Sequence, residues 1–293
     1  MLAGIVSAIS NPAIDTFIPE ATPKGAQANG LLAARAHNVA KLTGTITALS
    51  LPFLLATGGF ILNGVLMIVS ALILRAHNPQ NGGARRQKTE AIDWQVLRRI
   101  AQHYRQCPEN LDILLSSILL GLIIVPVGYI LMPLVLRENF PEYGNFIALM
   151  NILSWIGAIT ITAIASRLSA KITRPGQAAL LVWGLYGAAL LLLTQVGSFA
   201  MLCGLILCFG GVKLGKALVY GKYLHNAPDK QRGVLIAVDQ TAFWGLATLG
   251  TFGMGVLVDT IGLNPTICAV SAVVMFGTGL LAVRGHLVRM TPA

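Results

Sequence analysis

The amino-acid sequence predicts an all-α protein that is integral to a membrane, and two features support this. Only 11% of the residues are charged while 55% are hydrophobic, and the mean hydropathy is +0.72. Soluble globular domains have about 25% charged residues, so a water-soluble fold of this length would need a far more polar surface. The second feature is a polar stretch, from His77 to Glu109, that separates long apolar blocks.

The polar stretch is rich in basic side chains. Those in or beside it are Arg75, Arg85, Arg86, Lys88, Arg98, Arg99 and Arg105. A charged segment between apolar blocks is typical of a loop that joins two membrane bundles, and an excess of Lys and Arg marks loops on the cytoplasmic side. The sequence therefore predicts a partial N-terminal bundle over 1–76, a cytoplasmic central loop over 77–111 and a C-terminal bundle with its tail over 112–293.

About eight membrane helices are expected, two before this loop and six after it. Residues 1–10 are apolar but too short to span a bilayer, which takes about 20 residues, and the proline-containing segment after them is typical of a loop. The expected helices cover 28–55, 60–74, 112–136, 144–166, 177–195, 198–221, 234–257 and 265–284.

The loops between the last six helices alternate in charge. Lys and Arg recur in the 167–175 loop, the 222–232 loop and the C-terminal tail, whereas the intervening loops carry Arg137 as their only base. This alternation places the C-terminus of a multi-pass protein in the cytoplasm, with the bilayer of the inner (plasma) membrane as its partner. It also explains the formal charge of +10 without nucleic acid, because the basic residues form no single groove or stripe.

Two lysines lie inside a predicted membrane helix. Lys213 and Lys216 share a face of the 198–221 helix with Tyr220. Intramembrane charge is costly and usually faces a cavity or a partner. One interpretation is a cavity that attracts an anionic group. The other, which we favour, is a structural ion pair or a lysine whose ammonium reaches the interface.

Polar residues in two other helices raise the same question. Asp239 and Gln240 lie about two turns into the 234–257 helix. Asp239 is either a proton-coupling carboxylate or the partner of Lys216 at a similar depth, and we favour the pair because intramembrane charges tend to pair. Arg35 and His37 could gate or carry protons, although residues near a helix start more often lie at the membrane interface.

Small residues recur at helical spacing, which lets helices approach closely. We interpret two sets as packing positions: Gly204, Cys208, Gly211 and Gly215, then Gly245, Gly250, Gly253 and Gly255. Metal or cofactor binding is not expected, because the cysteines form no C-x-x-C pair and His103 with Cys107 lacks a second ligand pair. An enzyme is not expected either, since the Walker, H-E-x-x-H and G-x-S-x-G motifs are missing.

This order of elements resembles the major facilitator superfamily, which has two six-helix bundles joined by a long cytoplasmic loop. The N-terminal segment resembles the antibiotic- and siderophore-exporter branch through Pro19, the pair Ala28-Asn29 and the element Gly44-Thr45-Ile46-Thr47-Ala48, with Thr45 where that branch has proline. The loop after the second helix of the C-terminal bundle resembles the family's signature through Arg167 and Lys171, with Ser166 in its acidic place.

The resemblance implies alternating access, in which two bundles rock around a shared site. It makes 112–286 a complete C-terminal bundle, 28–75 helices five and six, 1–10 the end of helix four, and Arg167, Lys171 and Arg174 part of a cytoplasmic gating loop. We expect secondary-active export of a small organic molecule (siderophore, drug or metabolite), with a proton as the coupling ion. Because the first helices would be missing, we expect a truncated transporter that does not transport alone. The alternative is a non-transporting remnant or a regulatory subunit. No oligomeric state is predicted.

Overall fold

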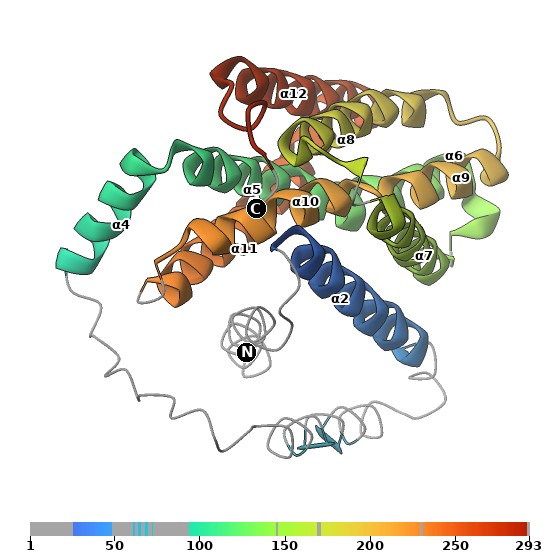
Figure 1. Ribbon diagram of the computed structural model, residues 1–293. Helices are drawn as coiled ribbons and strands as arrows, with labels where there is room; N and C mark the ends of the chain where they lie inside the picture. The colour runs from blue at the N-terminus through green and yellow to red at the C-terminus, as the bar shows by residue number, and fades with distance from the viewer. Residues whose placement is uncertain are drawn as a thin grey trace.

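The computed structural model of the 293-residue chain describes residues 26–48, 94–144, 146–168, 171–228 and 231–291, with isolated residues between 61 and 72. Across these ranges every regular element is helical, as predicted (Figure 1). The α-helices are α2 (Ala26–Ala48), α4 (Trp94–Gln106), α5 (Pro108–Pro126), α6 (Met132–Asn139), α7 (Ile147–Leu168), α8 (Pro175–Leu191), α9 (Phe199–Phe209), α10 (Val212–Asn226), α11 (Arg232–Ile261) and α12 (Leu263–Arg284).

Six segments are long and apolar enough to cross a membrane, which confirms the six helices predicted after the polar stretch. They are Pro108–Asn139, Ile147–Leu168, Pro175–Gln195, Phe199–Asn226, Arg232–Ile261 and Leu263–Arg284. Helix α2 covers most of the predicted 28–55 helix. The rest of that helix, nearly all of the 60–74 helix and residues 1–10 lie outside the described residues. The division at 76 and 111 stays a prediction.

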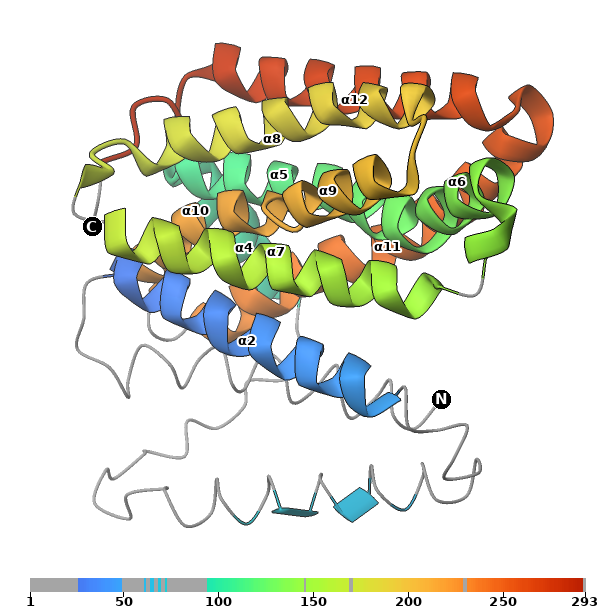
Figure 2. The ribbon, with the colours of Figure 1, turned by 90° about the vertical axis from the view of Figure 1, so that its right-hand side faces the viewer.

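Helix α10 lies at the centre of the bundle. It packs against α2, α5, α7 and α8. Helices α8 and α12 run side by side along one face, and α2 lies along the opposite side next to α7 (Figure 2). The fully buried Trp183 of α8 and Tyr223 of α10 fill the core between these layers. Because α10 touches four helices, its polar side chains have neighbours on several sides.

Two predicted single helices are interrupted. The predicted 198–221 helix is confirmed as one membrane span, Phe199–Asn226. Within it, Gly210 and Gly211 separate α9 from α10, and glycine is a poor helix former. In the first span, the π-helix η1 (Val127–Leu131) separates α5 from α6. This break follows Pro126, which has no N–H to donate to the carbonyl of Leu122.

Part of the predicted central loop is a helix, α4. The predicted segment between the bundles, 77–111, is thus helical over Trp94–Gln106, and α5 begins at Pro108 rather than at 112. Ile100, His103 and Tyr104 are buried, and their spacing of three and four places them on one helical face. The sequence analysis missed this amphipathic helix because its arginines make the segment polar on average, although one face is apolar.

Candidate functional site

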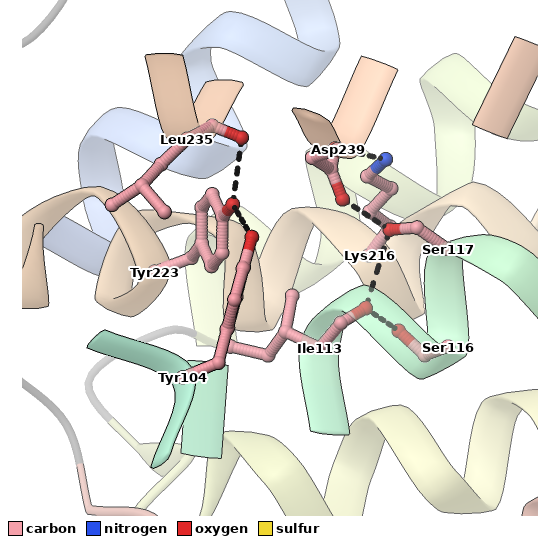
Figure 3. A network of polar contacts seen from close by, with 8 residues as sticks. All are labelled: Tyr104, Ile113, Ser116, Ser117, Lys216, Tyr223, Leu235 and Asp239. Carbon is pink, nitrogen blue, oxygen red and sulfur yellow. Dashed lines mark hydrogen bonds and ion pairs between the residues drawn. The ribbon is translucent and has the colours of Figure 1, made fainter. Parts of the chain in front are cut away.

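A buried ion pair connects α10, α11 and α5 near the middle of the bundle. Nζ of Lys216 lies 2.8 Å from Oδ2 of Asp239, and Oγ of Ser117 donates a hydrogen bond of 2.5 Å to Oδ1 of the same carboxylate (Figure 3). The Asp239 side chain is fully buried, while that of Lys216 is 21% exposed. Each carboxylate oxygen therefore has its own donor, which is what makes a buried carboxylate tolerable.

The neighbouring serine leaves Ser117 available for this role. Both Ser116 and Ser117 lie within hydrogen-bond distance of the backbone carbonyl of Ile113, at 2.6 and 3.2 Å. A hydroxyl carries one proton, so Ser117 donates to one acceptor at a time. The carboxylate is nearer and charged, and Ser116 already occupies the Ile113 carbonyl. Ser116 therefore makes the hydrogen bond within α5, and Ser117 makes the hydrogen bond to Asp239.

Aromatic rings surround the ammonium of Lys216. Nζ lies 4.9 Å from the ring centroid of Phe243 and 5.6 Å from that of Tyr220. A cation is attracted to an aromatic face within about 6 Å. The rings therefore give Lys216 a second, weaker environment close to its ion pair, and Tyr220 lies next to the lysine as predicted.

Glycines set the distance between α5 and α11. A Cβ added to Gly121 of α5 would meet the backbone carbonyl of Phe243, and one added to Gly250 of α11 would meet the backbone carbonyl of Leu122. The Leu122 carbonyl is also the one that Pro126 leaves without a helical donor. The two helices approach at both points because neither glycine has a side chain. This close approach is what allows Ser117 to reach Asp239.

A second hydrogen-bonded chain links α4 to the start of α11. The hydroxyl of Tyr223 donates to the carbonyl oxygen of Leu235 at 2.8 Å, so the Tyr104 hydroxyl, 2.9 Å away, donates to Tyr223. Burial raises the pKa of the Tyr104 hydroxyl, and the Asp239 charge adds to this effect. The group stays protonated and able to donate. Leu235 lies one turn before Asp239, so α4 contacts the helix that carries the carboxylate.

The junction of α4 and α5 is held by polar side chains. The Nδ2 of Asn110 lies 2.9 Å from Nε2 of His103. Since the amide donates, Nε2 accepts and the ring is neutral, in agreement with burial lowering the pKa of His103. A cavity of about 410 Å³ opens beside this junction, with Glu109 and His286 in its lining. The cavity is not lined by Lys213, Lys216 or Asp239.

A second ion pair, which the sequence reasoning missed, lies between α5 and α12. Nε of Arg284 donates to Oδ1 of Asp112 at 2.6 Å, and the Asp112 side chain is fully buried. Asp112 stands at the edge of an apolar run, where a solvated residue is the usual case. Its position facing the last turn of α12, 172 residues later, is invisible to sequence periodicity.

Lys213 does not pair with a carboxylate among the residues that the structure describes. Its Nζ lies over the indole ring of Trp155 in α7, 3.0 Å from the centroid. The ion-pair interpretation is therefore confirmed for Lys216 but wrong for Lys213. A tryptophan on the helix that faces Lys213 would have predicted this contact. The sequence alone does not show which helix faces α10.

The remaining predicted residues lie apart from the ion pair. Gln240 follows Asp239 directly, so it faces another direction on α11 and is half-buried. Arg35 and His37 are exposed on α2. The gating-loop residues are exposed at the end of α7 and before α8: Arg167, Lys171 and Arg174. Their roles stay predictions.

The packing interpretation of the small residues holds for some of them. Gly215 packs against the indole of Trp183, Gly211 against Ile161, and Gly250 against α5. Among the described residues, nothing lies within 4 Å of a Cβ added at Gly204, Gly245, Gly253 or Gly255, and Cys208 is exposed, so no packing partner is seen for these residues. Helical spacing shows that the small residues share one face of a helix. It does not show whether another helix packs against that face. Over the described ranges, no group of three metal-ligating side chains is present.

Comparison with known proteins identifies the family. The family model described as Major Facilitator Superfamily matches residues 1–251, and the match does not distinguish branches within the family. No curated protein matches the chain. The family match covers far more than half of the sequence and agrees with the six spans found above. The chain therefore belongs to the Major Facilitator Superfamily, a family of multi-pass membrane transporters rather than enzymes.

Proposed function

We propose that this chain acts in the secondary-active export of a small organic molecule across the plasma membrane, by alternating access and with its C-terminus in the cytoplasm. Family membership supports transport in general. The observation that carries the finer proposal is the buried contact of Lys216 with Asp239 and Ser117, because it joins three helices through one titratable carboxylate. Such intramembrane carboxylates are the groups with which proton-coupled pumps and transporters relay protons.

Protonation of Asp239 would change how the three helices hold together. The charged carboxylate attracts Lys216 and accepts from Ser117. A neutral carboxylic acid would lose the Coulomb attraction, and the ammonium could then shift towards the rings of Phe243 and Tyr220. Proton binding would therefore loosen α10 from α11. A transporter needs such a two-state element if a proton gradient is to bias alternating access.

The gating loop supports the same proposal. Arg167, Lys171 and Arg174 lie exposed between α7 and α8, at the end of the bundle where α10 finishes and α11 begins. A shift of α10 or α11 would first displace the residues at this end of the bundle, including this loop. The exporter branch remains part of the proposal and rests on Pro19, the pair Ala28-Asn29 and the element Gly44-Thr45-Ile46-Thr47-Ala48.

The test separates coupling from transport. The chain is reconstituted in vesicles, and a panel of siderophores, aromatic acids and dyes is screened for movement driven by a pH gradient and for exchange without a gradient. Asp239→Asn should abolish gradient-driven accumulation while leaving exchange, since the neutral side chain mimics the protonated state. Lys222→Met, on α10 with Lys216 but outside the ion pair, is the control.

Three outcomes distinguish the hypotheses. Loss of accumulation with exchange preserved in Asp239→Asn supports proton coupling through this carboxylate. Accumulation equal to that of the wild type would show that the ion pair is structural only. Absence of both activities in the wild-type chain would refute transport by this chain alone. That result is the one expected above for a chain that does not transport alone, and it is also consistent with the alternative, a non-transporting or regulatory membrane protein.

A further inference from the structure

Lys213 occupies an unusual position for a positive charge. It lies 13 residues from Asn226 at the end of α10, which corresponds to roughly 20 Å along the helix. A lysine side chain cannot reach the membrane interface over that distance. Its ammonium lies over the Trp155 ring instead. A cation–π contact compensates an ammonium less fully than a carboxylate does.

One further positive charge, that of Lys41 on α2, acts on Lys213. His37 stands four residues before Lys41 on the same face of the helix. The imidazole of His37 is neutral at pH 7, so it offers a hydrogen bond, and Lys41 supplies the charge. Helix α2 packs against both α7 and α10, with Leu31 and Leu218 among the buried residues of this contact. Two lysines and a histidine from two helices therefore lie within electrostatic range of one another, and the ammonium of Lys213 lies over Trp155.

Neither described ion pair supplies a negative charge to this cluster. The described carboxylates that pair with a base do so elsewhere, Asp239 with Lys216 and Asp112 with Arg284. Among the described residues, neither ion pair offsets the charges of Lys213 and Lys41, and charge inside a membrane bundle is costly without a partner. A bound anion would offset that cost, whereas a neutral or cationic molecule would not. Packing alone gives no reason for a lysine here, because a leucine or methionine would fill the same space.

We infer that Lys213, with Lys41 and His37, binds the anionic group, a carboxylate or a phosphate, of an organic molecule at the junction of α2, α7 and α10. In this structure the ammonium lies over the ring of Trp155. On binding, Nζ leaves the ring face and donates a charge-assisted hydrogen bond to the anion. The assignment of this molecule as cargo rests on the proposed function, while anion binding itself does not. A lipid headgroup presents the same chemistry as a solute.

Trp155 provides a direct readout of the site. The full chain is labelled with 5-fluorotryptophan, reconstituted in nanodiscs of phosphatidylcholine, and followed by ¹⁹F NMR, with the Trp155 signal assigned from Trp155→Phe. Benzoate and phenyl phosphate are the anionic probes, and benzamide is the neutral control of similar shape. Nanodiscs containing phosphatidylglycerol, without added solute, test the lipid source. The other tryptophan signals report whether each variant is folded.

The expected result is a saturable shift of the Trp155 signal with benzoate or phenyl phosphate and none with benzamide. Lys213→Met should weaken the apparent affinity at least about tenfold, as expected when a hydrogen bond to a charged group is lost. Lys41→Met should weaken it several-fold, and Lys222→Met should leave it unchanged. A shift caused by phosphatidylglycerol and not by the soluble anions would assign the site to lipid and overturn the cargo reading.

Other outcomes overturn the inference itself. An equal shift with benzamide, an unchanged affinity in folded Lys213→Met, or no shift with any anion or with phosphatidylglycerol would each do so. Because the measurement needs no gradient and no flux, it is independent of the transport assay. Anion binding without transport would support this site and refute the proposed function. Transport without anion binding would support the proposed function and refute this site.

Discussion

Removing one partner of the Lys216–Asp239 pair should destabilise the bundle. Two unit charges 2.8 Å apart attract by about 6 kcal/mol at an effective dielectric constant near 20. Desolvation offsets part of this attraction, and breaking a buried pair costs about 3–5 kcal/mol because a charge is left buried alone. Asp239→Asn leaves Lys216 alone, and that lysine is 21% exposed, so we expect about 3 kcal/mol, the low end of that range. Lys216→Met leaves the fully buried Asp239 alone, so we expect about 5 kcal/mol, the high end.

The double variant Lys216→Met with Asp239→Asn makes the prediction specific to the pair. With both charges removed, no unpaired charge is left, and Ser117 can still donate to the oxygen of the asparagine. The double variant should therefore be more stable than the sum of the single effects by about 2 kcal/mol. Unfolding is followed by tryptophan fluorescence in mixed micelles of dodecyl maltoside with increasing sodium dodecyl sulfate. Lys222→Met serves as the control for losing a lysine from α10.

One result would refute this reasoning. If each single substitution costs less than about 0.5 kcal/mol and the two effects simply add, the charges do not interact in the folded protein. The Lys216–Asp239 contact would then contribute nothing to stability. The role of Asp239 as a coupling group would also lose its structural basis, because protonation would release nothing.

Three further predictions concern other parts of the chain. Gly121→Ala should destabilise the protein by about 1–3 kcal/mol in the same unfolding assay, since a Cβ there meets the backbone of α11, whereas Gly245→Ala, which has open space, should not; equal effects would contradict the packing argument. Burial lowers the pKa of His103 below its ordinary 6.5, so the docking of α4 should be fully stable above that pH and weaken as the pH falls below it. Hydrogen exchange of residues 94–106, corrected for intrinsic rates, should show this, and His103→Gln should lose the pH dependence. Reporter fusions after Pro228 should lie in the cytoplasm and fusions after Leu263 outside; the reverse pattern would overturn the orientation.

Much of the fold and part of the site could be predicted from the sequence. The six C-terminal spans follow from hydropathy, because each helix must cover its own backbone in lipid and so carries its own signal. The Lys216–Asp239 pair could be predicted because charge in a membrane seeks a partner at similar depth, and both depths can be counted from the helix ends. Helix α4 was missed because its arginines outweighed a single apolar face.

The sequence by itself determined the membrane class, the number of C-terminal spans and Asp239 as the favoured partner of Lys216, because these depend on composition and on position along one helix. Only the tertiary structure decided that Ser117 completes the carboxylate, that Lys213 rests on Trp155 and that Gly121 and Gly250 bring α5 to α11. Ser117 and Asp239 are 122 residues apart. Whether they meet depends on how closely two helices pack and how each is rotated, and a one-residue rotation of about 100° would separate them.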